Sequence, residues 1–220
     1  LSDDGCNVDN ANLMRDALIH AKRLELPVLC HCEDTSMVAN RAVNEGSVSR
    51  QLWMEGRPAI AEEIMVMRDA MLAEETGAHV HICHISTAKA VDIVRRMKKR
   101  GIALTCETCP QYFTLTEDEV LTQGSMARVN PPLRTAKDIK GIIAGLKDGM
   151  TVSFHHHLRN GDYVLNLVME AVAQLGIRDL TVNASSLFDI HLPLLDHIQN
   201  HVVTGIQTDY MSAALGREIS

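Results

Sequence analysis

Two histidines that follow short apolar runs are the residues of this sequence best suited to chemistry. His31 comes after Val-Leu-Cys and His84 after Val-His-Ile-Cys, and the acidic pair Asp3 and Asp4 stands in an earlier segment. Neutral imidazole and carboxylate groups are the donors that zinc takes in proteins. Each histidine alone is better explained as a hydrogen-bonded core residue, whereas the combination makes a divalent metal site an equal alternative to that explanation.

A competing zinc signal is the pair Cys106 and Cys109, which has two residues between its members. Structural zinc sites built from such pairs use two of them, and this sequence has no second pair. The cysteine pair is therefore a weak alternative to the histidine site.

The elements that must position these residues follow from the apolar pattern, which switches regularly between helical and strand periods. Helices are predicted at residues 11–24, 59–76, 88–100 and 137–147, and strands at residues 27–31, 79–84 and 102–107. Strands that alternate with helices indicate a parallel sheet, either in an α/β barrel or in an open doubly wound fold. Both folds place active sites at the C-terminal ends of strands, where His31 and His84 stand, so position alone does not decide between them. Within the second strand we expect Val80, Ile82 and His84 to share one interior face.

The alternation continues beyond Met150, with no flexible linker between the two regions. Strands are predicted at 151–154, 180–184 and 202–208, and helices at 163–175 and 192–199. Residues 130–134 must be extended, because a proline disfavours helix in the residue before it.

Composition excludes several classes of function. The formal net charge of −7 favours neither a nucleic-acid groove nor an anionic membrane surface, and every apolar run is shorter than a membrane span. Of the six cysteines, four lie in apolar, strand-like runs typical of buried thiols. We therefore expect a cytoplasmic protein that acts on a small molecule, with no nucleic-acid or membrane partner.

Six motifs in the first two-thirds of the chain carry a specific resemblance. In order they are Ser2-Asp3-Asp4-Gly5, His31-Cys32-Glu33-Asp34, Asn44-Glu45-Gly46, Ala61-Glu62-Glu63 with Arg68-Asp69, His81-x-x-His84-x-Ser86-Thr87 and Asn130-Pro131-Pro132-Leu133-Arg134. Residues 1–149 resemble the middle of a bacterial dihydroorotase, in the amidohydrolase superfamily. The resemblance implies a segment of a (β/α)8 barrel.

The same resemblance implies roles for four residues. His31 and His84 are similar to the two histidines of one metal position, and Asp4 is similar to a carboxylate that contacts the metals. Asn130 is similar to a residue that contacts the pyrimidine ring of the substrate. Zinc is the expected cofactor, with at most one ion here, and the implied reaction is attack of activated water on a cyclic amide.

Departures from the family pattern lead us to expect an incomplete site. The family's first strand, with its His-x-His pair and an arginine for the substrate, would precede Leu1. After Gly149 the family continues with a strand ending Thr-Asp-His-Ala-Pro-His, whose aspartate shuttles a proton, but this chain continues Met-Thr-Val-Ser-Phe. We therefore expect the chain to be inactive as a dihydroorotase.

The continuation resembles a different family. Residues 147–220 are similar to the start of the citrate lyase α subunit, an acyl-carrier-protein transferase related to CoA transferases, and they imply a second, partial α/β segment. The resemblance implies that one loop lines an acyl or citrate pocket. The residues of this loop are His155, His156, His157, Arg159 and Asn160.

We therefore predict two regions, residues 1–149 and 150–220, joined as an engineered or recombined chimera or by a mis-assembled reading frame. The predicted function is that of a metal-dependent cyclic amidohydrolase. One alternative is a transferase in which the second region carries the activity, and another is a non-catalytic chimera. Because part of a barrel leaves open strand edges, we also expect self-association.

Overall fold

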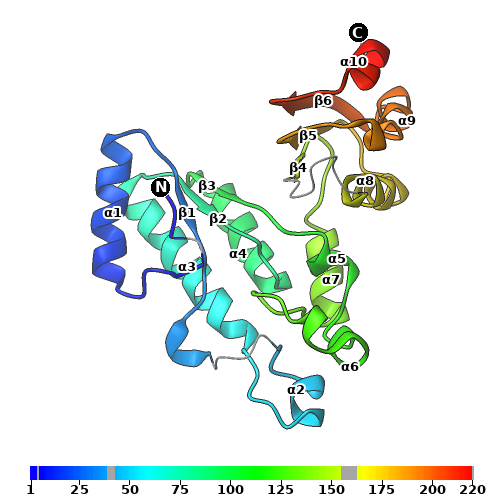
Figure 1. Ribbon diagram of the computed structural model, residues 1–220. Coiled ribbons are helices and arrows are strands. Elements are labelled where there is room, and N and C mark those ends of the chain that lie inside the picture. Colours follow the sequence, from blue (N-terminus) through cyan, green and yellow to red (C-terminus); the bar gives the residue numbers. More distant parts are fainter. Residues whose placement is uncertain (4, 39–42, 155–162, 220) are drawn as a thin grey trace. The chain divides into compact units, whose positions relative to one another are not determined.

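The computed structural model describes residues 1–220 except residues 4, 39–42, 155–162 and 220 (Figure 1). The chain forms two compact units, Leu1–Gly145 and Leu146–Ser220. This division falls four residues before the predicted boundary between residues 149 and 150. Among the described residues, no helix combines the length and the apolar character needed to cross a membrane.

A three-stranded parallel sheet forms the centre of the first unit, in the order β1-β2-β3. Its strands are β1 (Val28–Cys30), β2 (Val80–Ile82) and β3 (Leu104–Cys106). The register aligns Cys30 with Ile82 and Ile82 with Cys106, so all three strands end at the same level. Ser2 forms a parallel bridge with Leu29, which places the start of the chain beside β1.

The longer helices of this unit pack side by side in the order α1, α3, α4 and α7 (Figure 1). They are α1 (Ala11–Arg23), α3 (Ala59–Thr76), α4 (Ala88–Lys99) and α7 (Ala136–Ile143), and shorter helices are α2 (Ser47–Gln51), α5 (Gln111–Thr114), α6 (Glu119–Gln123), η1 (Thr35–Met37) and η2 (Gly124–Ala127). Local chemistry sets their ends. The Asn10 side chain accepts hydrogen bonds from two backbone N–H groups at the start of α1, and Gly77 ends α3 with a φ of +67°.

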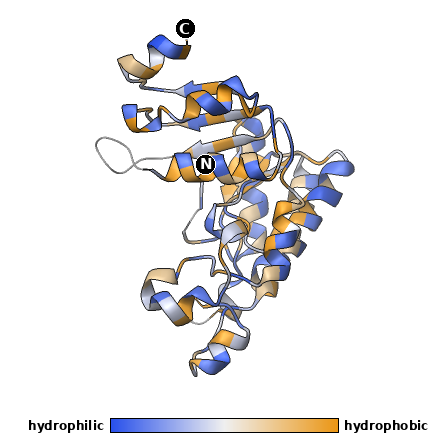
Figure 2. Ribbon diagram, turned by 90° about the vertical axis from the view of Figure 1, so that its right-hand side faces the viewer, coloured by the Kyte–Doolittle hydropathy of each residue, from blue (hydrophilic) through white to orange (hydrophobic). Residues whose placement is uncertain are grey.

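The main core of the first unit lies between the sheet and helices α1, α3 and α4. Its buried members include Val28, Cys30, Val80, Ile82 and Leu104 from the strands and Leu18, Val66, Ala70, Ile93 and Val94 from the helices. The helices carry hydrophobic and hydrophilic stretches in alternation, as expected of elements with one buried face (Figure 2).

The prediction that Val80, Ile82 and His84 share an interior face is wrong. Strand β2 ends at Ile82, and Val80 and Ile82 pack in the core shared with the helices. His84 follows the strand with a φ of +37°, so the two-residue alternation of a strand no longer determines where its side chain points.

The second unit contains its own parallel sheet, in the order β4-β5-β6. Its elements are β4 (Thr151–Phe154), α8 (Val164–Gln174), β5 (Leu180–Ala184), η3 (Asp189–His191), α9 (Leu194–Gln199), β6 (Val203–Thr208) and α10 (Ala213–Ile219). A separate core includes Leu165, Met169, Val182 and Leu194, all fully buried. The predicted α/β class with parallel sheets is thus confirmed in both units.

Candidate metal centre

His31 and His84, which were predicted as metal ligands, lie together at the C-terminal ends of β1 and β2. His31 directly follows β1, and His84 comes two residues after β2. The Nδ1 atom of His31 is 3.1 Å from the Nε2 atom of His84. Two nitrogen ligands of one tetrahedral zinc ion are separated by about 3.3 Å, given zinc–nitrogen distances of about 2.0–2.1 Å. The pair therefore suits one shared ion as well as one shared proton.

The main chain of His31 is held by Asp3. One carboxylate oxygen of Asp3 accepts a hydrogen bond from the His31 N–H at 2.9 Å, and the other accepts from the Val8 N–H at 3.0 Å. Asp3 is therefore occupied with backbone groups. Its neighbour Asp4, which was predicted as the third metal ligand, lies outside the described residues.

The loop after His84 is fixed by a buried carboxylate from α3. Glu62 is 4% exposed and accepts hydrogen bonds from the backbone N–H groups of Ser86 and Thr87, at 3.1 and 3.0 Å. Both hydroxyl groups also donate to it. Because a carboxylate with this many partners has little freedom, the backbone next to His84 is held in place.

Asn130, which was predicted to contact substrate, lies against His31. Its Nδ2 atom is 3.5 Å from the Nε2 atom of His31, and its Oδ1 atom accepts a hydrogen bond from Arg57 at 2.6 Å. The same guanidinium donates to both carboxylate oxygens of Glu33, at 2.9 and 2.8 Å. The structure therefore brings His31, His84 and Asn130 together, while their roles as metal ligands and substrate contact stay predictions.

Glu33 and Arg57 also belong to this cluster, although neither was predicted to have a role in the site. The Nε2 atom of His31 is 3.5 Å from a Glu33 oxygen. Burial acts to raise the pKa of Glu33, but hydrogen bonding with His31 and the charge of Arg57 outweigh it, so this pKa lies below its usual value. Glu33 stands in the His-Cys-Glu-Asp motif, so the sequence offered a signal for its role in the site. The sequence around Arg57 contains no motif that indicates such a role.

Arg134, the last residue of the Asn-Pro-Pro-Leu-Arg motif, has a supporting role. It donates to the Ser86 hydroxyl at 3.0 Å, to the Asn44 side chain at 2.9 Å and to the Arg57 carbonyl at 2.8 Å. It is 4% exposed, and burial lowers the pKa of its guanidinium. These bonds tie the segments that carry Arg57 and Asn130 to the loop after His84.

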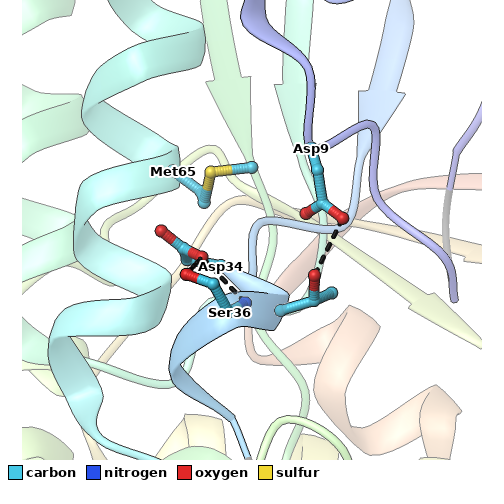
Figure 3. Close-up of a pocket in the computed structure, with 5 residues that line it drawn as sticks. Asp9, Asp34, Ser36 and Met65 are labelled. Carbon is cyan, nitrogen blue, oxygen red and sulfur yellow. Dashed lines mark hydrogen bonds between the residues drawn. The ribbon is translucent and has the colours of Figure 1, made fainter.

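A hollow beside this region is lined by Asp9, Asp34, Thr35, Ser36 and Met65 (Figure 3). Its two carboxylates accept hydrogen bonds from neighbours: Thr35 donates to Asp9 at 2.8 Å and Ser36 to Asp34 at 2.6 Å. Neither His31 nor His84 lines it. The hydroxyl groups satisfy the acidic oxygens locally, so we place the candidate metal centre at the histidine pair.

Two other sets of predicted residues have different outcomes. Cys106 and Cys109 do not belong to any group of three or more potential ligands within the described ranges. The implied acyl or citrate pocket of His155, His156, His157, Arg159 and Asn160 lies outside the described residues.

Two families of known proteins are similar to different parts of the chain. A dihydro-orotase-like family matches residues 1–90, and the family of the citrate lyase alpha subunit matches residues 134–220. The chain joins parts that resemble two families. This confirms both predicted resemblances.

Individual relatives agree with the first assignment. A dihydroorotase of Pelobacter propionicus is 46% identical over 180 residues, which is 80% of this chain and 42% of that protein. A dihydroorotase of Ruminiclostridium cellulolyticum is 49% identical over 149 residues, or 68% of this chain and 35% of that protein. The match of 149 residues is as long as the predicted resemblance of residues 1–149, and the match of 180 residues is longer. The chain spans about two-fifths of the curated relatives it matches.

Two solved structures are similar to parts of the chain. A D-hydantoinase shares 23% identity and a TM-score of 0.54 over 63% of this chain and 31% of its own, which supports a common fold. The alpha subunit of citrate lyase from Streptococcus mutans, crystallised with citrate, is 51% identical over 34% of this chain and 15% of its own, with a TM-score of 0.33.

Proposed function

We propose that the first unit is the metal-binding segment of a cyclic amidohydrolase of the dihydroorotase type. The observation that carries the proposal is the 3.1 Å approach of His31 Nδ1 to His84 Nε2 at adjacent strand ends. The identity of 46% to a dihydroorotase supports the choice of reaction class. The substrate class is a small cyclic amide.

The donor set fits a divalent ion such as zinc. His31 and His84 would hold it, with Asp4 as the third ligand by resemblance, and such a set leaves a coordination position open. Neutral imidazoles are ligands that zinc accepts readily. The chemistry that the ion supplies when bound is activation of water and polarisation of an amide carbonyl.

The surrounding residues orient the ligands and shape the substrate side. Glu33 faces His31 Nε2, and an N–H on that nitrogen leaves the lone pair of Nδ1 directed at the metal position. Arg57 holds Glu33 and the carbonyl oxygen of Asn130 at once. The Asn130 amide nitrogen is thereby fixed beside His31, where it can donate to a carbonyl oxygen of a cyclic amide.

We infer that the isolated chain does not complete the reaction. By resemblance, the family's proton-shuttling aspartate stands in a strand that follows Gly149, and this chain has Thr151–Phe154 at that place. General acid–base assistance is typically worth about 10²- to 10⁴-fold in rate. Metal binding and catalysis are therefore separable properties of this chain.

Calorimetric titration with Zn²⁺ tests the metal-binding claim. We expect the His31→Ala/His84→Ala variant to bind one ion fewer per chain than the wild type. A matched variant, His20→Ala/His197→Ala, removes two histidines outside the centre and should bind as many ions as the wild type. Equal stoichiometry in the wild type and the His31→Ala/His84→Ala variant would contradict the proposal.

A second candidate function is favoured by the match of residues 134–220 to the citrate lyase alpha subunit. In that case the second unit would carry a transferase activity on acyl-carrier-protein thioesters. The test is exchange of acetyl and citrate groups on an acyl carrier protein. Detectable exchange would rank this function above the amidohydrolase assignment, and its absence would leave the first proposal as the better one.

A further inference from the structure

A second group of potential metal ligands lies at the ends of β2 and β3. It consists of His81, Cys83 and Glu107, whose ligand atoms all lie within 4.8 Å of one another. The backbone explains the cluster. His81 pairs with Thr105 in the parallel register, and Cys83 and Glu107 directly follow the ends of β2 and β3. The Cys83 N–H donates to the Cys30 carbonyl and the Glu107 N–H to the Ile82 carbonyl, each at 3.0 Å, so both residues continue the hydrogen bonding of the sheet.

The distances and exposure of the cluster suit a coordinated ion. The Nε2 atom of His81 is 3.6 Å from an oxygen of Glu107. Two ligands of a tetrahedral zinc ion are separated by about 3.3–3.7 Å. The Cys83 residue is 5% exposed, whereas the side chains of His81 and Glu107 are 22% and 51% exposed. The group thus has a buried thiol and an accessible carboxylate that can move to complete the shell.

Thr105 orients His81 from the other side of its ring. Its hydroxyl oxygen lies 2.9 Å from His81 Nδ1 and 2.9 Å from His79 Nε2. When His81 Nδ1 donates to Thr105 and the hydroxyl donates to His79, all three groups are satisfied. His81 Nε2 then directs its lone pair at the cluster, an arrangement typical of the outer partners of metal-bound histidines.

We propose that His81, Cys83 and Glu107 bind one thiophilic divalent ion of the zinc class, with ligands separate from the His31–His84 pair. A thiolate, an imidazole and a carboxylate are a set that zinc prefers, while magnesium and calcium take oxygen ligands. The ion replaces the thiol proton of Cys83, which is released to solvent. The site is independent of the proposed hydrolase function, because none of its ligands belongs to that centre.

Cobalt titration under a phosphine reductant tests this site. Co²⁺ alone is the probe, because a cysteine thiolate bound to it gives a near-ultraviolet charge-transfer band that histidine and carboxylate ligands do not give. We expect the band in the wild type and its loss in Cys83→Ser. The band should persist in Cys6→Ser, which removes an exposed cysteine elsewhere. Absence of the band from the wild type, or its survival in Cys83→Ser, would overturn the proposal.

Variants at two partly exposed positions keep the test decisive if Cys83→Ser fails to fold. We expect Glu107→Gln to weaken Co²⁺ binding by at least about tenfold and Thr105→Val by about 10- to 100-fold, as for partners that orient metal ligands. Unchanged affinity in both would show that the thiolate binds cobalt with other groups and would also overturn the proposal. The band should persist in His31→Ala/His84→Ala, so failure at one site is distinguishable from failure at the other.

Discussion

The Nδ1 atom of His31 lies 3.1 Å from the Nε2 atom of His84, although 53 residues separate the two in sequence. The approach depends on the register of β1 with β2, in which Cys30 stands opposite Ile82. A shift of that register by one residue would separate the two rings. The pairing of β1 with β2 therefore positions the candidate centre. The buried groups around the centre hold the strand ends and the loops that follow them.

The most costly of these groups to remove should be Glu62. Its carboxylate accepts from Ser86 and Thr87 and lies 3.9 Å from the buried guanidinium of Arg134. Removing one partner from a buried charged network leaves the other without compensation, at about 3–5 kcal/mol. We expect Glu62→Ala to lower the free energy of unfolding by this amount in urea denaturation.

The neighbouring residue Glu63 provides the matched control. It pairs with Lys89 at 2.9 Å, and the Lys89 side chain is 62% exposed. An ion pair in contact with solvent contributes less than about 1 kcal/mol. If Glu63→Ala proved as destabilising as Glu62→Ala, the buried network would not be the source of the loss.

The elements of the first unit were predictable where local signals are strong. Helix α1 shows a clear apolar period and begins after the polar cap Asn10, and α3 ends at Gly77. Both helices were predicted to within a residue. The closeness of His31 and His84 was also predictable, because parallel strands end at a common edge.

The partners of buried charges could not be predicted in the same way. Glu62 and Arg134 come from segments far apart in sequence, and no local pattern tells which distant charge a buried group meets. The same holds for Arg57, whose partners Glu33 and Asn130 lie in two other segments. The face of β2 that meets the helices was misjudged because a three-residue strand has almost no periodicity of its own.

The buried carboxyl group of Asp69 should make the free energy of unfolding depend on pH. Burial raises its pKa above the ordinary value of 3.8, despite the Arg68 charge. The folded chain therefore holds this proton more tightly than the unfolded chain, and the stabilisation is lost as the pH rises from 3.8 through the raised pKa. We expect Asp69→Asn to gain stability relative to the wild type across that window, by urea unfolding at several pH values. If the stability of the variant relative to the wild type stayed constant or fell as the pH rises through this window, the prediction would be wrong.

We predict self-association through the outer edge of β3, which pairs only with β2 within the described parts of the chain. Exposed edges pair with other chains. Light scattering at protein concentrations of about tens of micromolar, a range suited to weak association, should show dimers or larger species. Charge at this edge, introduced by Cys106→Lys, should shift the population toward monomer. A monodisperse wild-type monomer under reducing conditions would count against the prediction.

We predict that the isolated chain does not open the dihydroorotate ring at an enzymatic rate, even with zinc supplied. The strand Thr151–Phe154 offers no carboxylate to move a proton to the leaving nitrogen. Ultraviolet absorbance follows the ring opening, with His84→Ala as the control. Zinc-dependent turnover in the wild type that disappears in His84→Ala would show that the chain completes the site by other means.

The most direct test of the metal centre observes the two ring nitrogens themselves. Long-range ¹H–¹⁵N correlation spectra of the histidine side chains, recorded during Zn²⁺ titration of the Cys83→Ser chain, separate this centre from the second cluster. We predict that Nδ1 of His31 and Nε2 of His84 shift together and saturate at one equivalent of zinc. If both nitrogens kept their metal-free shifts while zinc bound elsewhere, the assignment of this pair as a metal centre would be wrong.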